Sequence, residues 1–210
     1  MPVYKSISIN SQTNVKIWSI TESYEELMQH ITLKKESFDR VKAMKSELHQ
    51  RGFLSVRLLL KAFGYSDFDL FYDKNGKPHL TDGRYISITH SYTFSAVVVS
   101  SSPVGIDIEK QREKITKIAS KFIGFEDCYL RKNNAHYIQK LTWIWCIKEA
   151  QYKLYATTGM SFKKHFLVTP FGEEKNTTVA WILDGKKRQR FEAFFLEFDG
   201  FGCAITTPLR

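Results

Sequence analysis

The apolar and polar positions alternate with two different periods along the chain. A helical period runs over 35–63 and again over 137–158, and each run ends at a glycine (Gly64 and Gly159), which is typical of a helix end. Shorter patterns predict a helix that begins after Ser23, with Glu26 completing a capping box, and a helix over 114–122. Strand-like runs occupy 15–20, 69–72, 86–89, 95–100, 104–109, 165–169, 178–183, 190–197 and 202–206. Asn75-Gly76 predicts a hairpin turn.

Each half of the chain therefore reads as a long helix, a glycine and then antiparallel strands. We predict an α+β fold of two similar subdomains, residues 1–102 and 103–210, related by a pseudo-twofold, each with a long helix packed on an antiparallel sheet. The two halves meet near Ser102 to Val104, and no Pro/Gly/Ser-rich linker separates them. The residue similarity between the halves does not by itself establish a duplication.

Composition excludes several classes of protein. Of 210 residues, 43% are hydrophobic and 14% aromatic, which excludes a disordered chain. There is no apolar run of about 18 residues, so no transmembrane helix is expected. The three cysteines form no C-x-x-C pair, and the N-terminus lacks the apolar core of a signal peptide. We therefore expect a cytoplasmic protein without disulfides.

The net charge of +9, from 31 Lys+Arg against 22 Asp+Glu, favours a polyanionic partner. Nucleic acid, a membrane surface, an acidic protein and a phosphorylated small molecule all fit that description. The basic cluster at 186–190 follows Asp184-Gly185, and we interpret it as a solvated hairpin tip rather than a docking patch. No helix has a one-sided Lys/Arg stripe and no nucleic-acid motif is present, so a nucleic-acid-binding protein remains only the alternative hypothesis.

Two carboxylates stand out in the strand-like run at 104–109. Asp107 and Glu109 are two residues apart, so on a strand they point to the same face. Like charges held this close repel unless a cation lies between them. Oxygen ligands suit Mg²⁺, which typically takes one or two carboxylates together with substrate phosphates. The alternative is an exposed edge strand with solvated acids.

The helix predicted over 137–158 is apolar on two sides, which indicates that it is substantially buried. The window between those sides contains Thr142, Cys146, Glu149 and Lys153. Glu149 and Lys153 are neighbours at i,i+4. They are either an ordinary surface ion pair or part of the lining of a pocket, and the burial of the helix favours the pocket.

Two short segments carry groups that can donate to phosphate. Ser87-Ile88-Thr89-His90-Ser91 ends a predicted strand with hydroxyls and an imidazole, and Lys77 lies at the predicted hairpin tip. Either segment alone is as consistent with a structural or solvated role.

Taken together, four motifs resemble those of the 4′-phosphopantetheinyl transferase superfamily. They are G-K-P at 76–78, S-x-T-H-S at 87–91, V-G-I-D-I-E at 104–109 and W-x-x-K-E-A-x-x-K at 145–153. The length resembles the monomeric, two-subdomain branch that activates surfactin-type synthetases. The resemblance implies Mg²⁺-dependent transfer of 4′-phosphopantetheine from coenzyme A to a serine of an apo carrier protein, with release of adenosine 3′,5′-bisphosphate. It also implies a monomer with its active site between the subdomains, an acidic acyl or peptidyl carrier protein as partner, and neither nucleic acid nor membrane.

The same resemblance implies a role for each matched residue. Asp107, Glu109 and Glu149 would hold Mg²⁺, Lys153 would contact the phosphates, Lys77, Thr89 and His90 would bind the nucleotide, and Arg40 would bind phosphate. Thr89 stands where many relatives have serine, and Arg57 is a further cationic candidate with an equally good structural explanation. Either Glu149 or a metal-bound water would take the serine proton. A catalytically silent relative would lack one of these residues, and all of them are present.

Overall fold

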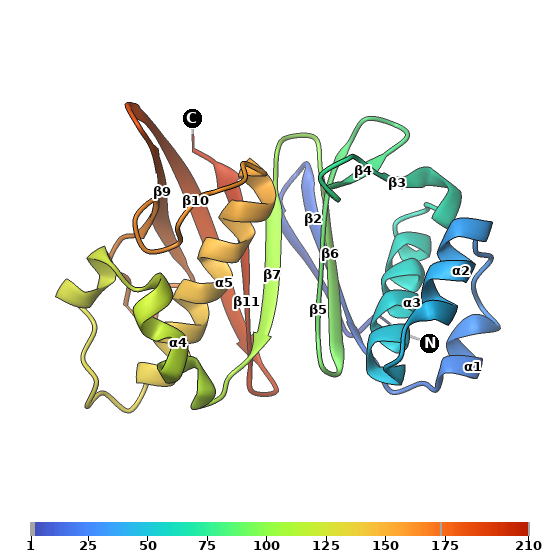
Figure 1. Ribbon diagram of the computed structural model, residues 1–210, viewed down its shortest axis with the longest axis horizontal. Helices are drawn as coiled ribbons and strands as arrows, with labels where there is room; N and C mark the ends of the chain where they lie inside the picture. The colour runs from blue at the N-terminus through green and yellow to red at the C-terminus, as the bar shows by residue number, and fades with distance from the viewer. Residues whose placement is uncertain (1–2, 173, 210) are drawn as a thin grey trace. The chain divides into compact units, whose positions relative to one another are not determined.

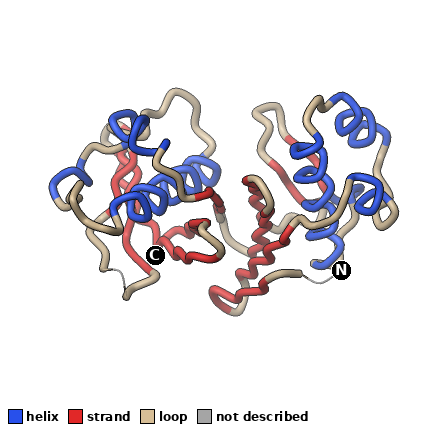
Figure 2. Tube along the Cα trace, turned by 90° about the horizontal axis from the view of Figure 1, so that it is seen from below, coloured by secondary structure: helices blue, strands red, loops and turns tan. Residues whose placement is uncertain are grey.

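The computed structural model describes residues 3–172 and 174–209, and the chain divides into two compact units, Met1–Ser102 and Pro103–Arg210. Each unit has its own antiparallel sheet with helices packed against it, as the ribbon shows (Figure 1). Helices and strands, coloured blue and red in Figure 2, occur in both units. The predicted α+β class is confirmed.

The N-terminal unit is built on a four-stranded sheet with the order β1-β2-β6-β5. Its strands are β1 (Lys5–Asn10), β2 (Thr13–Ser19), β5 (Tyr85–Ser91) and β6 (Phe94–Ser100), and β3 (Leu70–Tyr72) and β4 (Pro78–Leu80) form a separate hairpin. Its helices are α1 (Tyr24–Met28), α2 (Lys35–Ala43), α3 (Glu47–Ala62) and the 3₁₀ turn η1 (Asp67–Asp69). The apolar pattern did not predict β1, which has no buried residue.

The predicted capping box is confirmed at α1, where Ser23 and Glu26 each accept the other's backbone N–H. The single helical run over 35–63 is wrong, because the structure has two helices there. Met44 adopts an extended backbone (φ −72°, ψ 125°), which ends α2. The Gln50 side chain donates to the carbonyl oxygens of Val41 (3.2 Å) and Met44 (3.1 Å), which replaces helical partners lost at the break.

The N-terminal core lies between α3 and its sheet. Leu54, Leu59 and Leu60 of α3 are fully buried in one apolar cluster with Val97 and Val99 of β6. The helix ends as predicted, since Gly64 just beyond it has φ +87°. The hairpin at Asn75-Gly76 is present, but residues 73–77 form a longer loop than the predicted two-residue turn.

The C-terminal unit is built on a five-stranded sheet with the order β7-β11-β10-β9-β8. Its strands are β7 (Gly105–Lys110), β8 (Phe166–Val168), β9 (Thr177–Asp184), β10 (Lys187–Phe198) and β11 (Phe201–Pro208). Its helices are α4 (Lys114–Phe122), the 3₁₀ turn η2 (Phe125–Cys128) and α5 (Tyr137–Tyr155). The long α5 lies along β7 and β11, with α4 beside it (Figure 1).

The helix predicted over 137–158 ends earlier than expected. Ala156 takes the left-handed conformation (φ +53°), and its N–H donates to the Tyr152 carbonyl at 2.8 Å, which closes α5. Gly159 lies in the following turn and is not the helix cap. The predicted burial of α5 is confirmed, since ten of its residues are buried.

Two glycines allow α5 to lie unusually close to the sheet. A Cβ at Gly105 of β7 would overlap the carbonyl oxygen of Ala150, and one at Gly202 of β11 would lie 3.1 Å from the Thr142 and Trp143 side chains. Glycine is therefore required at Gly105 for space and not for backbone conformation. This close approach brings the side chains of β7 onto the face of α5.

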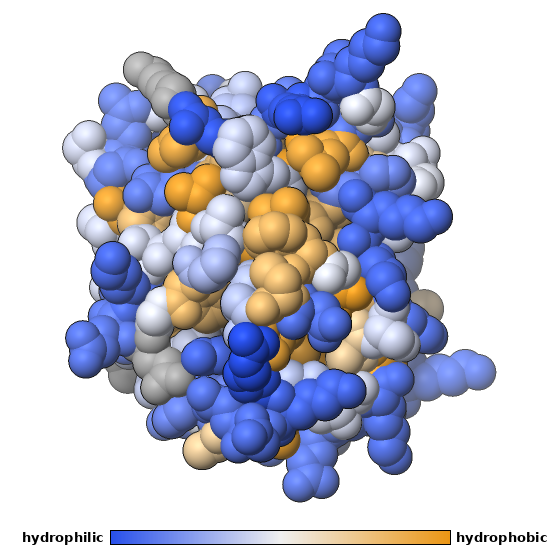
Figure 3. Space-filling view, turned by 90° about the vertical axis from the view of Figure 1, so that its left-hand side faces the viewer, coloured by the Kyte–Doolittle hydropathy of each residue, from blue (hydrophilic) through white to orange (hydrophobic). Residues whose placement is uncertain are grey.

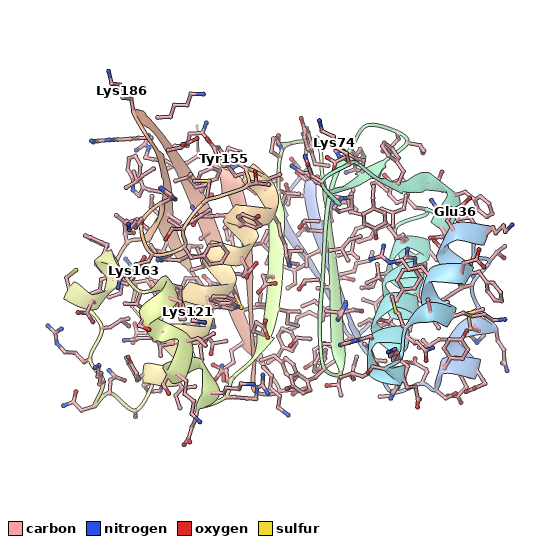
Figure 4. All side chains as sticks on the ribbon, viewed as in Figure 1. Glu36, Lys74, Lys121, Tyr155, Lys163 and Lys186 are labelled. Atoms are coloured by element: carbon pink, nitrogen blue, oxygen red, sulfur yellow. The ribbon has the colours of Figure 1, made fainter. Side chains whose placement is uncertain are left out.

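The basic cluster at 186–190 is an exposed hairpin tip, as predicted. Lys187 pairs with Asp184 across a two-residue turn, and Lys186 projects from the tip (Figure 4). On the face of the molecule drawn in Figure 3, hydrophilic side chains project around smaller apolar areas. Among the described residues, no helix is long and apolar enough to cross a membrane.

Candidate active site

The carboxylates of Asp107 and Glu109 lie on the α5 side of β7, as does Gly105. Asp107 pairs with Ala204 and Glu109 with Gly202 of β11, two residues with little or no side chain. Asp107 is 5% exposed and Glu109 is half-buried. The predicted common face of the two acids is confirmed, and they are not the fully solvated acids of an exposed edge.

Lys153 connects α5 to β7. Its Nζ lies 2.7 Å from Asp107 Oδ1 and donates to the Ile106 carbonyl at 3.0 Å. The Lys153 side chain is 30% exposed, so this ion pair is not fully enclosed in the core. The structure therefore contradicts the interpretation of Lys153 as only half of a surface i,i+4 pair.

Glu149 completes a cluster of three acids and one lysine. Burial, followed by the charge of Asp107, raises the pKa of Glu149 to about 7; Lys153 opposes this shift, and Glu109 adds to it. The carboxylates are thus close enough to repel one another, and one ammonium does not neutralise three of them. Such a cluster is stabilised when it binds a cation or a proton.

The other two residues in the predicted helix window serve packing. Thr142 donates to the Ile138 carbonyl of its own helix (2.8 Å), and the buried Cys146 donates to the Gly202 carbonyl (3.5 Å). Burial, and then the negative charge of Asp107, raises the pKa of the Cys146 thiol well above its usual value. A thiol held in this form is a poor nucleophile.

A magnesium site on the three acids is chemically reasonable but is not preassembled. Within residues 3–172 and 174–209, no three His, Cys, Asp or Glu side chains are arranged to hold a metal ion together. The donor set fits Mg²⁺, because it is all oxygen and carries surplus negative charge, and substrate phosphates supply further ligands. The magnesium assignment therefore stays a prediction.

The sequence patterns missed a cavity of about 150 Å³ beside Glu109. Its lining combines cations with apolar side chains: Glu109, Lys110, Arg112, Lys114, Ile115, Ile118 and Trp145. The signal in the sequence is the run of cations that leads into the amphipathic α4.

The patterns also missed the role of Lys148, which is fully buried and lies 2.7 Å from Glu126. Burial lowers the pKa of Lys148, and Glu126 opposes that shift.

The candidate nucleotide-binding residues lie in the N-terminal unit. Thr89 is buried and His90 is exposed at the end of β5, and the His90 ring lies beside Gly52 of α3. Lys77 lies in the β3–β4 loop, where Lys74 is labelled in Figure 4. Burial lowers the pKa of Lys77, and the Asp73 carboxylate opposes this.

The two arginines proposed from the sequence differ in their surroundings. Arg40 is exposed, with its guanidinium 5.5 Å from the centre of the Tyr72 ring. Arg57 is buried, and its Nε donates to Asp67 Oδ1 at 3.0 Å. Arg57 is therefore explained as a structural residue, and Arg40 remains available to a ligand.

The carboxylates on β7, with a lysine and a glutamate on the facing helix, form a cluster with surplus negative charge. A model of the 4′-phosphopantetheinyl transferase superfamily matches residues 103–206, the stretch that contains Asp107, Glu109, Glu149 and Lys153. The C-terminal unit, Pro103–Arg210, therefore matches this superfamily over most of its length.

Among curated proteins, the chain is similar to the 4′-phosphopantetheinyl transferase gsp of Aneurinibacillus migulanus, with 28% identity over 159 residues. The match covers 73% of this chain and 65% of that protein, so the chain spans less than two thirds of the length of this relative. Among solved structures it is similar to the holo-[acyl-carrier-protein] synthase (AcpS) of Thermotoga maritima, with 16% identity and a TM-score of 0.36. That match covers 51% of this chain and 63% of the other.

Proposed function

We propose that this protein transfers the 4′-phosphopantetheine group of coenzyme A to a serine of an apo acyl or peptidyl carrier protein, with Mg²⁺, and releases adenosine 3′,5′-bisphosphate. One observation carries the proposal. In the motif residues shared with the superfamily, Lys153 reaches across to Asp107 at 2.7 Å while Asp107 and Glu109 help to raise the pKa of Glu149 to about 7. The site thus combines surplus carboxylate with a phosphate-binding cation.

In this proposal Asp107, Glu109 and Glu149 hold Mg²⁺, which when bound neutralises charge on the coenzyme A pyrophosphate. Lys153 contacts the phosphates and balances the negative charge that develops on the leaving group. Its ammonium is oriented by Asp107 and the Ile106 carbonyl on a side chain that is 30% exposed, which supports this role.

The reaction needs a base, and Glu149 fits that role. The serine oxygen forms a bond to the phosphorus that carries pantetheine, while the bond from that phosphorus to the bridging pyrophosphate oxygen breaks. The serine proton passes to the base, and the bridging-bond electrons leave with adenosine 3′,5′-bisphosphate. In the metal-free site burial raises the pKa of Glu149 to about 7, so its carboxylate can take up a proton near neutral pH; a bound Mg²⁺ would lower that pKa.

The nucleotide end of coenzyme A is assigned to the N-terminal unit. Lys77 and Thr89 bind the adenine nucleotide, with His90 directed at the 3′-phosphate and Arg40 binding phosphate. The exposure of His90 and Arg40 supports the assignment, because both groups are accessible to a ligand.

Further parts of the proposal concern the whole protein. We further propose that the two units have the same kind of fold and that the protein acts as a cytoplasmic monomer. The net charge of +9 favours an acidic carrier protein as the partner.

Intact-mass spectrometry tests the proposal directly. Apo fatty-acid, polyketide and peptide carrier proteins are each incubated with the protein, coenzyme A and Mg²⁺. We expect one of them to gain the mass of one phosphopantetheine, and its serine-to-alanine variant to gain nothing. Asp107→Asn should abolish the gain, whereas Asp127→Asn, a matched change at an exposed acid of η2, should preserve it. No mass gain on any carrier would contradict the proposal.

A further inference from the structure

A second polar cluster lies inside the C-terminal unit, on a different side of α5 from Glu149 and Lys153. Lys148 Nζ lies 2.7 Å from Glu126 Oε1 and donates to the carbonyl oxygens of Phe122 (2.7 Å) and Phe162 (3.1 Å). An ammonium has three N–H donors, and each of these has an acceptor. Successive helical residues are about 100° apart, so Lys148 faces away from the β7 carboxylates.

Glu126 is satisfied in the same way. Its Oε1 also accepts the backbone N–H of Val168 (2.8 Å), and its Oε2 accepts the N–H of Gly124 (3.1 Å). Both side chains of the ion pair are 0% exposed. The pair therefore ties α5 to the end of α4, to η2, to the segment at Phe162 and to β8.

The residues that hold Lys148 also hold the preceding turn of α5. The Trp145 ring centre lies 5.1 Å from that of Phe122 and 5.4 Å from that of Phe162. Phe122 and Phe162 thus contact α5 at positions i and i+3, with their rings on Trp145 and their carbonyls on Lys148. Trp145 and Lys148 are the first two fixed residues of the motif that continues into Glu149 and Lys153.

On the β7 side, α5 is held by the close contact of Gly105 with Ala150. A helix seated only by apolar packing can rotate slightly about its axis. A rotation of about 10° moves a carboxylate about 6 Å from the axis by about 1 Å. A displacement of about 1 Å at a reacting group can cost about 100-fold in rate.

We propose that Lys148 and Glu126 are positioning residues whose buried ion pair sets the rotation of α5 and so holds Glu149 and Lys153 opposite the β7 carboxylates. The inference rests on the proposed transferase function. It assigns the buried pair a role beyond stability, which a buried ion pair often supplies no better than apolar residues do.

The test compares charge-matched double variants of two buried ion pairs. In K148M/E126Q both charges are removed together, so no single buried charge is left unpaired. The control is R57M/D67N, because Arg57 and Asp67 form a buried pair at 3.0 Å with 3% and 0% exposure in the other unit. The melting temperature, kcat, the KM for the carrier protein and calorimetric binding of coenzyme A in Mg²⁺ are measured for each.

We expect K148M/E126Q to lower kcat by about 100-fold and to weaken coenzyme A binding, with the carrier KM within about 2-fold of the wild type. The control should lose similar thermal stability and keep kcat within about 2-fold. If K148M/E126Q does not fold, E126Q alone decides by the same comparison, since it keeps the lysine and removes one N–H acceptor.

Two results would overturn the positioning role in an active wild type. One is a folded K148M/E126Q variant with wild-type kcat and coenzyme A affinity, and the other is an equal loss of kcat in the control. A wild-type protein that neither binds coenzyme A nor modifies any carrier contradicts the proposed function itself, and the positioning role falls with it.

Discussion

Two lysines on α5, five residues apart, each lie 2.7 Å from a carboxylate, but the two ion pairs differ in burial and in charge balance. Lys148 and Glu126 are 0% exposed, and both partners have their remaining hydrogen-bonding groups satisfied by backbone. Lys153 is 30% exposed, and its partner Asp107 belongs to a cluster with two further acids. The first pair is complete in itself, whereas the second has charge left over.

The difference shows how to separate a structural ion pair from a functional one. A buried pair with every donor and acceptor satisfied gains nothing from a ligand. A pair that is partly open and embedded in excess negative charge is stabilised by a cation and phosphates. Burial and charge balance, rather than the 2.7 Å distance, distinguish the two.

The largest effect is expected at the open cluster. Glu149→Gln should lower transfer by about 1,000-fold, because it removes both a carboxylate ligand and the candidate base. Initial rates at saturating coenzyme A and carrier protein measure the loss. A variant that keeps more than a tenth of the wild-type rate would remove Glu149 from the catalytic residues.

The same variant should be more stable than the wild type at alkaline pH in metal-free buffer. The pKa of Glu149 is raised in the folded protein, so its contribution is favourable below its unfolded value of about 4.5 and is lost as the pH rises through about 7. Glutamine does not ionise, and the gain in melting temperature should therefore grow between about pH 5 and about pH 8. A constant difference across that range would show that Glu149 does not titrate as described.

Substituting the two lysines separately sharpens the contrast. Lys148→Met should destabilise the fold by about 3–5 kcal/mol, because it leaves Glu126 buried and unpaired. Lys153→Met should destabilise the fold less than Lys148→Met, because the Lys153 side chain is 30% exposed, but should lower the rate by about 100-fold. Denaturant unfolding and initial rates measure both quantities, and the reverse pattern would invalidate the distinction.

Alanine at the two close-packing glycines tests how tightly α5 is seated. Gly105→Ala should destabilise the protein by about 1–3 kcal/mol, since the new methyl meets the backbone of Ala150, which cannot move without shifting the helix. Gly202→Ala should cost less, because its neighbours at 3.1 Å are side chains of Thr142 and Trp143. Equal melting temperatures for the two variants would argue against close packing of α5 on β7 at Gly105.

The smallest effect is expected from salt. Raising the ionic strength should weaken carrier binding, mostly through a slower association rate, and affect coenzyme A binding less. Surface plasmon resonance across one salt series measures both, with a DNA duplex as the third ligand. Tight duplex binding at physiological salt without coenzyme A binding would favour the nucleic-acid alternative instead.

Features that depend on residue spacing and on near neighbours in the chain could be predicted from the sequence. Apolar spacing identified α5 and its burial, alternation put Asp107 and Glu109 on one face, and the motif around Glu149 and Lys153 indicated the superfamily. The apolar period merged α2 and α3 into one helix and extended α5 beyond Tyr155, because Met44 and Ala156 carry no strong local stop signal and end α2 and α5 through their backbone conformation.

The ion pairs, by contrast, could not be predicted from the sequence. Asp107 and Lys153 are 46 positions apart, and Lys148 finds Glu126 and the Phe122 carbonyl on separate elements. Helical and strand periods define the direction of a side chain but not which residue from another segment it contacts. Whether a lysine is sealed in the core or open to a ligand depends on packing between distant segments, and so it became visible only in the folded chain.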